Sequence, residues 1–163
     1  MAPRRFDSEI IIDEQDRWTF RGNIITQAEI LKYFRNSLKE SHNGIYIENV
    51  FGELSENGYL KAIGYPCHII TVGLDEDGLV FYGDDDKSYK FPEFEIYRTK
   101  EDAIIGMDSE KPLIKYRFDW NAASQLAQYL EEENGVTYLL LGDVKMELPT
   151  YEGEIEVPLP ASY

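Results

Sequence analysis

The spacing of apolar residues changes at Asn43-Gly44, and this change constrains the fold more than any other feature of the sequence. Before it, apolar residues recur at helical spacing, which predicts a helix over residues 27–40. After it, apolar and polar residues alternate in short segments bounded by turn residues, as they do in strands with one buried face. These segments are residues 45–51, 59–63, 67–72, 79–82, 88–91 and 94–97. This order predicts antiparallel strands joined as a meander beside a helix.

Two hairpins are predicted outside this region. The first pairs residues 10–12 with 17–20 around a polar turn, and the last pairs residues 136–141 with 144–148 around Gly142-Asp143. A further strand is predicted over residues 113–118. The fold class predicted is therefore α+β, with antiparallel meander sheets and two capped helices.

Short local motifs predict where helices and turns begin and end. Thr26 with Glu29 matches a capping box for the first helix. Asp119 is suited to cap a second helix, whose apolar face is expected to include Trp120 and which Asn134-Gly135 would end. Asn57-Gly58 has the composition of a tight hairpin turn.

The chain is expected to form one α+β domain over residues 1–148, followed by an acidic, proline-containing tail at 149–163. A strand, a capped helix and a second strand occur in the same order twice, which suggests a weak repeat between residues 9–64 and 113–148. Ordinary α+β architecture gives the same order without duplication.

The formal net charge of -15 makes nucleic acid and anionic membranes poor partners. No apolar run approaches the ~20 residues of a membrane helix. Cys67 is the single cysteine, so no internal disulfide can form, and a reducing cytoplasm is expected. A homodimer is compatible with the sequence, which does not define the oligomeric state.

Two histidines limit the catalytic chemistry that can be predicted. His42 is expected at the end of the first helix, where it would complement the helix dipole. His68 follows Cys67 in a strand, so the two side chains point to opposite faces and cannot form a dyad. A satisfied, partly buried histidine is the favoured interpretation of His68, with a base or ligand as the alternative.

Residues 84–95 partly match a calcium-binding loop, with Asp84 and Asp86 as weak metal candidates. Tyr89 replaces the glycine that such a loop needs, and Pro92 interrupts it, so a solvated turn is favoured. No phosphate-binding loop is present, and no cofactor is predicted.

The tyrosine-rich strands provide the candidate binding residues, because tyrosine combines an apolar ring with a polar hydroxyl. The candidates are Tyr46, Tyr59, Tyr65, His68 and Tyr82. The open alternative is that these tyrosines only fill half-buried sheets.

Four short patterns support a resemblance to known families: Ile12-Asp13-x-x-x-x-Trp18, Gly44-Ile45-Tyr46, Tyr65-Pro66 and residues 79–83. In these patterns the chain resembles an uncharacterised family found in bacteria and eukaryotic mitochondria (DUF4505, UPF0598). More distantly, it resembles bacterial proteins of the DUF1285 family. The resemblance implies an α+β fold with repeated substructures and a regulatory or ligand-sensing role.

A non-catalytic cytosolic binding or regulatory module is the favoured function, with a basic protein or a small molecule as its partner. The first alternative is a carboxylate- or cation-dependent hydrolase that uses Asp75, Asp77, Asp84 and Asp86. The second is an inhibitor or immunity-type protein whose acidic surface covers a basic active site.

Overall fold

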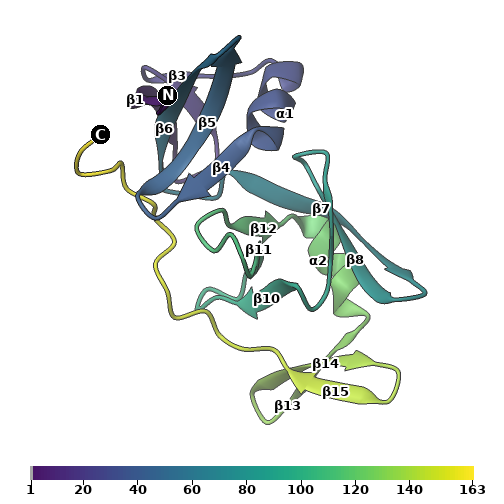
Figure 1. Ribbon diagram of the computed structural model, residues 1–163. Coiled ribbons are helices and arrows are strands. Elements are labelled where there is room, and N and C mark those ends of the chain that lie inside the picture. The colour runs from purple at the N-terminus through teal and green to yellow at the C-terminus, as the bar shows by residue number, and fades with distance from the viewer. Residues whose placement is uncertain (1) are drawn as a thin grey trace.

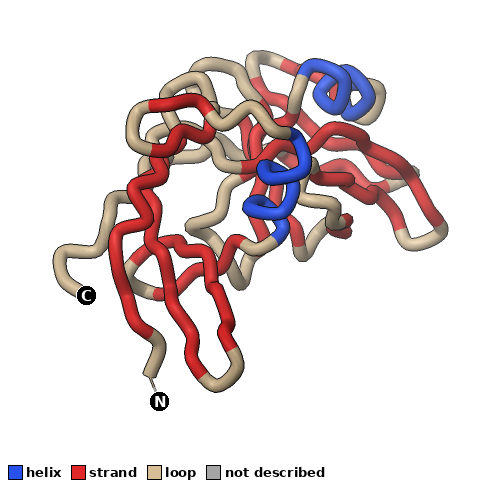
Figure 2. Tube along the Cα trace, turned by 90° about the horizontal axis from the view of Figure 1, so that it is seen from above, coloured by secondary structure: helices blue, strands red, loops and turns tan. Residues whose placement is uncertain are grey.

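The computed structural model describes residues 2–163, which form many short strands and two short helices (Figures 1 and 2). The first part of the chain forms β1 (Arg4–Ile12), β2 (Trp18–Phe20), β3 (Asn23–Ile24), α1 (Ala28–Asn36), β4 (Leu38–Ser41), β5 (Gly44–Phe51) and β6 (Leu54–Ala62). The second part forms β7 (Cys67–Asp75), β8 (Gly78–Gly83), β9 (Ser88–Lys90), β10 (Phe94–Arg98), β11 (Ile104–Asp108), β12 (Tyr116–Phe118) and α2 (Trp120–Ala127). The last three strands are β13 (Leu130–Glu133), β14 (Val136–Leu141) and β15 (Val144–Glu147). Antiparallel pairs dominate, so the fold is α+β.

The first sheet has the order β3-β2-β1-β6-β5-β4 and the second has the order β10-β11-β12-β7-β8-β9. Each has one parallel pair at its centre, β1 with β6 and β12 with β7, and antiparallel neighbours on both sides. Residues 4–62 and residues 67–118 therefore form sheets with the same order and direction of strands. The predicted repeat pairs different segments, 9–64 with 113–148, and stays a prediction.

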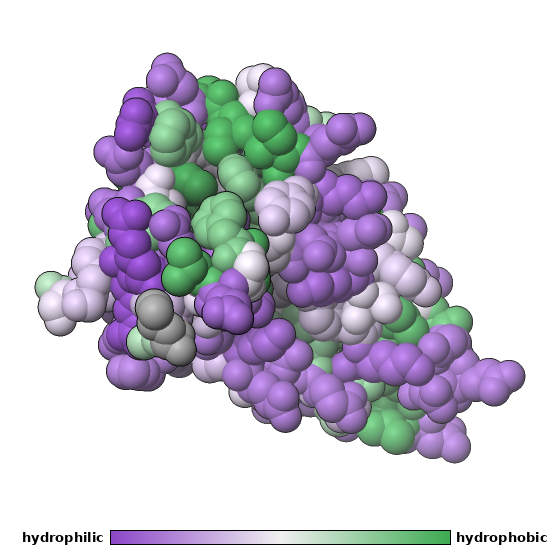
Figure 3. All heavy atoms as spheres, turned by 45° about the horizontal axis from the view of Figure 1, so that its top comes forward, coloured by the Kyte–Doolittle hydropathy of each residue, from purple (hydrophilic) through white to green (hydrophobic). Residues whose placement is uncertain are grey.

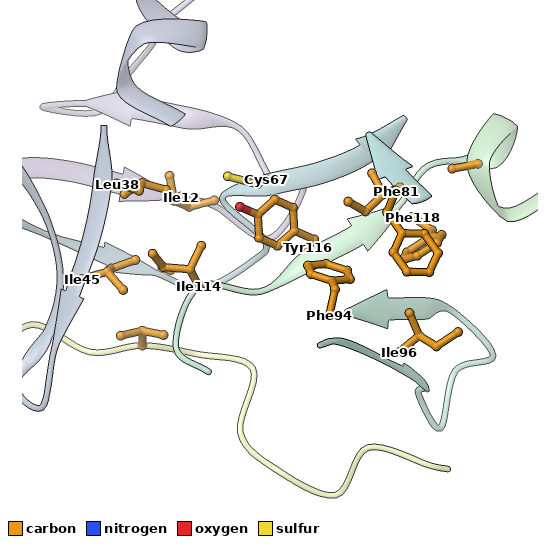
Figure 4. Packing of buried hydrophobic residues seen from close by; sticks show 14 of the residues in the cluster. Ile12, Leu38, Ile45, Cys67, Phe81, Phe94, Ile96, Ile114, Tyr116 and Phe118 are labelled. Carbon is orange, nitrogen blue, oxygen red and sulfur yellow. The ribbon is translucent and has the colours of Figure 1, made fainter. Parts of the chain in front are cut away.

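One hydrophobic core runs from the first sheet into the second (Figure 4). Ile12, Leu38 and Ile45 contribute to it from the first sheet, and Phe81 and Phe94 from the second. Because the two sheets share this core, their residues are held together where the sheets meet.

The first helix is shorter than predicted, because it ends at Asn36 and Leu38 begins strand β4. Leu38 pairs with Ile47 and is 4% exposed, so burial against β5 outweighs the helical spacing of this segment. The expected capping box at Thr26 does not form, since the N-cap is Gln27 and no side chain caps the helix. His42 consequently lies in the turn between β4 and β5, and the prediction that it caps a helix is wrong.

The turn predicted at Asn57-Gly58 does not form, because both residues lie inside β6. The turn falls instead between Phe51 and Leu54, which pair across the hairpin. Gly58 lies opposite Phe6 of β1, and a Cβ at Gly58 would lie 3.3 Å from the Phe6 ring. A Cβ at this position would be crowded, so glycine favours the close approach of the two parallel strands.

Asp119 caps α2 as predicted, because its side chain accepts a hydrogen bond of 2.8 Å from the Ala122 amide. The helix ends at Ala127, well before Asn134-Gly135, and residues 130–133 form β13 instead. Trp120 does not contribute to the apolar face as predicted, since it is 84% exposed.

The segment predicted as a tail, residues 149–163, runs extended along both sheets (Figure 1). Thr150 forms a bridge with Arg98 of the second sheet, and Val157 forms one with Ala62 of the first. Val157 is also 3% exposed and belongs to the core. This segment therefore contacts both sheets.

Candidate functional site

His68 lies at the start of β7, where its imidazole is held between two carboxylates. Its Nε2 lies 2.8 Å from Asp16 Oδ2, and its Nδ1 lies 3.3 Å from Asp84 Oδ2. Asp84 also accepts a hydrogen bond of 2.8 Å from the His68 amide. Asp16 is in the turn between β1 and β2, and Asp84 directly follows β8, so His68 connects the two sheets.

These contacts make His68 a cation at neutral pH. Burial of the ring by itself would lower the pKa of His68, but the hydrogen bonds to Asp16 and Asp84 outweigh burial and raise that pKa to about 9. Both ring nitrogens of the resulting imidazolium donate to carboxylates. His68 therefore has no free nitrogen with which to act as a general base at neutral pH.

Two arginines extend this arrangement from other elements of the fold. Arg35 of α1 lies 3.4 Å from Asp84 through Nε, which also donates a hydrogen bond of 3.3 Å to the Pro66 carbonyl. Arg117 of β12 lies 3.3 Å from Asp16, which accepts a hydrogen bond from the Tyr65 amide as well. We refer to Asp16, Arg35, His68, Asp84 and Arg117 together as the charged cluster.

A cavity of about 340 Å³ opens beside the charged cluster, and we call it the junction cavity. Its lining residues come from the β1–β2 turn, the β6–β7 connection, the β10–β11 loop, strand β12 and the C-terminal segment: Glu14, Ile63, Gly64, Tyr65, Thr99, Glu101, Ala103, Arg117 and Ile155. The volume lies within the range of about 300 to 1,000 Å³ that is usual for small-molecule sites. The cavity thus has room for a small ligand next to a fixed cation.

Arg117 is the group that connects the charged cluster to the junction cavity. Its guanidinium lies over the Tyr65 ring, 4.8 Å from the centroid, while 44% of its side-chain surface stays exposed. Its Nε is buried and makes no hydrogen bond within residues 2–163, although Asp16 is close enough to form an ion pair. Burial raises the pKa of Tyr65 to about 12, so its hydroxyl keeps its proton.

A second buried polar group lies behind the charged cluster. Asp85 is 1% exposed, and its Oδ2 accepts hydrogen bonds of 2.6 Å from the hydroxyls of both Tyr89 and Tyr116. Burial, together with the nearby carboxylate, raises the pKa of both hydroxyls. Asn36 of α1 donates a hydrogen bond of 2.8 Å to the Asp85 carbonyl. This group supports the turn that positions Asp84.

A larger and more apolar cleft of about 470 Å³ lies between β3 and α1. Phe20, Ile24 and Ile30 line it and are each about 40 to 50% exposed. Figure 3 shows apolar side chains gathered on this upper end of the molecule. The cleft has no charged side chain in its lining, which is why the junction cavity is the better candidate for a selective site.

The structure separates the five predicted binding residues into three groups. Tyr65 and His68 both contact Asp16, where the two sheets meet. Tyr46 and Tyr59 pair across β5 and β6, and Tyr59 is 1% exposed with its hydroxyl 3.1 Å from Ser41 Oγ. Tyr82 stands apart on β8 and is 45% exposed.

The four acids proposed for a hydrolase do not converge. Asp75 and Asp77 share Lys90 at the tip of the β7–β8 hairpin, at 3.5 and 3.1 Å. Asp84 belongs to the charged cluster, and Asp86 faces Lys32 at 3.6 Å. Within residues 2–163, no three His, Cys, Asp or Glu side chains are arranged to hold a metal ion.

Sequence reasoning found Tyr65, His68 and Asp84 but missed Asp16, Arg35 and Arg117. Asp16 was assigned to a polar turn, yet it is 8% exposed. Its φ is positive, at 65°, a conformation that aspartate tolerates better than most residues. Cys67 is buried, and burial raises the pKa of its thiol well above the ordinary value.

The fold and the site define an α+β protein with two six-stranded sheets that meet at a charged junction. Among solved structures, a DUF1285 family protein from Silicibacter pomeroyi is 17% identical with a TM-score of 0.67, over 93% of this chain and 85% of that one. A DUF1285 family protein from Shewanella baltica is 11% identical with a TM-score of 0.56, over 74% of this chain and 91% of that one. No family model and no curated protein matches the sequence.

The more distant of the two predicted resemblances, to DUF1285 proteins, is thus supported at the level of the fold. Neither comparison concerns the family found in bacteria and mitochondria. Neither helix in the described part of the chain has the length and apolar character needed to cross a bilayer.

Proposed function

We propose that the protein is a non-catalytic cytosolic module that binds a small molecule in the junction cavity. The observation that carries this proposal is Arg117, whose guanidinium is fixed by Asp16 and the Tyr65 ring and still faces a cavity of about 340 Å³. A preordered cation beside apolar walls can orient a ligand with little loss of side-chain entropy.

The state of the titratable groups supports binding over catalysis. The raised pKa of His68 leaves it protonated, and the raised pKa of Tyr65 leaves its hydroxyl neutral at pH 7. Cys67 is fully buried and cannot meet a substrate. The hydrolase alternative requires Asp75, Asp77, Asp84 and Asp86 in one pocket, and their ion pairs distribute them between separate places.

Two further predictions remain compatible with this proposal. The net charge of -15 would favour a basic protein partner, as an inhibitor of a basic enzyme also requires. Membership in the DUF4505 or UPF0598 family also stays a prediction, since it depends on short sequence patterns alone.

A fragment screen by ligand-observed NMR tests the proposal on the full chain. We expect fragments to bind the wild type and to lose binding in Ala103→Phe, because Ala103 lines the junction cavity and a larger side chain would fill it. The control is Ser109→Phe, because Ser109 lies in an exposed turn. Ala123→Phe would not serve as a control, because Ala123 packs against the core. Fragments that bind all three proteins equally, or no binding at all, would show that the junction cavity is not a ligand site.

A further inference from the structure

We infer that the ligand of the junction cavity carries a carboxylate and an ammonium group on an apolar body, as an α-amino acid with a large apolar side chain does. This inference rests on the proposed function and names the class of ligand. It follows from the charged residues that line the cavity, from its apolar lining and from the net charge of the whole chain.

The lining of the junction cavity presents charges of both signs. Arg117 is the single cation among the lining residues, and Glu14 and Glu101 are the two acids. A guanidinium recognises a carboxylate through its planar donors, and a carboxylate accepts hydrogen bonds from an ammonium group. A ligand with one group of each kind can therefore satisfy both signs at once.

The two glutamates are available for such a contact. Neighbouring acids are already paired, because Asp13 contacts Arg17, Asp102 contacts Arg98 and Glu152 contacts Lys100. Within residues 2–163, neither Glu14 nor Glu101 forms an ion pair of this kind, and both are exposed. The influence of Glu101 reaches Tyr65, where its charge contributes to the raised pKa of the hydroxyl.

Most of the remaining lining of the cavity is apolar and favours a hydrophobic body on the ligand. Ile63, Ala103 and Ile155 line it, together with the ring of Tyr65. A small zwitterion such as glycine would leave these walls in contact with water. A large apolar side chain would cover them and remove them from water, which favours binding.

The net charge of the protein further limits which classes of ligand can bind. A chain with a formal charge of -15 repels a ligand that carries only a carboxylate. A ligand that carries only an ammonium group is attracted, but it offers no carboxylate to the exposed part of Arg117 and brings a like charge towards it. A zwitterion has no net charge to be repelled and matches both signs in the cavity.

Three related probes separate these possibilities by isothermal titration of the full chain: L-phenylalanine, N-acetyl-L-phenylalanine and L-phenylalaninamide. They share one side chain and carry both charges, the negative charge alone and the positive charge alone. We expect phenylalanine to bind with a Kd at least about tenfold lower than either derivative, since each loses one charged contact. A derivative that binds as tightly as phenylalanine would overturn the inference and leave the proposed function intact.

Charge-removing variants provide the second arm of the test. Replacing both acids, as Glu14→Gln with Glu101→Gln, should weaken binding of phenylalanine and not that of N-acetyl-L-phenylalanine, while the exposed Glu110→Gln serves as the control. An equal effect on both ligands would contradict a contact with the ammonium group. If none of the probes binds while fragments do bind in an Ala103-dependent way, the inference alone is wrong; if neither binds, the proposed function is wrong too.

Discussion

Replacing His68 is the perturbation whose energetic effect the structure defines best. The folded-state pKa of His68 is raised to about 9, above the usual 6.5 that applies to an unfolded chain. The protonated ring therefore stabilises the fold fully below about pH 6.5, and this contribution is lost as the pH rises through about 9. His68→Gln keeps a polar side chain of similar reach but removes the titration.

The magnitude follows from the difference between the two pKa values. One pH unit of difference corresponds to about 1.4 kcal/mol, so a rise from 6.5 to about 9 is equivalent to about 3 kcal/mol. The His68 side chain is 20% exposed, and its partners Asp16 and Asp84 are 8% and 18% exposed, so solvent screens these contacts only partly. We therefore expect the full effect to be of this order.

Urea unfolding near pH 6 and near pH 10, followed by the fluorescence of the buried Trp18, measures this difference. We expect the free energy of unfolding of the wild type to exceed that of His68→Gln by about 3 kcal/mol more near pH 6 than near pH 10. The comparison cancels the other groups that titrate in this range. His42→Gln, at an exposed turn position, should follow the wild type at both pH values. Parallel pH profiles for wild type and His68→Gln would refute the assignment of His68 as an imidazolium held by two carboxylates.

Two further substitutions test the site and the core. Gly64→Ala should destabilise the protein and shift the NMR titration of His68, because a Cβ there would collide with Asp16 Oδ1 and the Asp13 carbonyl. Gly73→Ala should do neither, because a Cβ there would meet only Tyr82 Cε2, at 3.6 Å. Leu126→Ala should lower the free energy of unfolding by about 2 to 5 kcal/mol because the side chain is fully buried, and Trp120→Ala should lower it by less than about 0.5 kcal/mol. Urea unfolding checks both pairs, and equal losses for Leu126→Ala and Trp120→Ala would show that α2 packs through a different face.

The sequence predicts the first and the last hairpin of the chain. The opening hairpin pairs Ile12 with Trp18, and the last hairpin pairs Leu141 with Val144, as the short apolar segments and the turn residues between them predict. Strand β11 was missed because Ile105, Gly106 and Met107 are all buried, so its residues show no alternation. The two parallel pairs were missed as well, since strand pairing over a long stretch of chain has no local sequence pattern.

Helix ends were predicted poorly for a related reason. In α1 the apolar spacing continues to Leu38, and in α2 it continues to Leu130, but both residues belong to strands. Leu130 pairs with Leu139 of β14, as Leu38 pairs with Ile47 of β5. Apolar residues at these boundaries fit either structure, and the partner strand decides which one forms.

The charged cluster shows why the site was only half predicted. Asp16 and His68 are separated by 52 positions in the sequence, and Arg35 and Arg117 reach the cluster from α1 and β12. No local spacing relates these residues, because the meeting of the two sheets brings them together. Only Tyr65, His68 and Asp84 could be proposed in advance, the first two as binding residues and Asp84 as a weak metal candidate.

The cluster also limits what the net charge of a chain says about its sites. The whole chain carries a formal charge of -15, yet the charged cluster holds three cations, Arg35, Arg117 and protonated His68, against the carboxylates of Asp16 and Asp84. The local balance is therefore positive by one charge while His68 is protonated. Long-range repulsion by the acidic surface acts on every approaching anion, whereas the cluster attracts a carboxylate only at contact distance. A site of this kind discriminates against ligands with a net negative charge and accepts a carboxylate when a positive group on the same molecule compensates it.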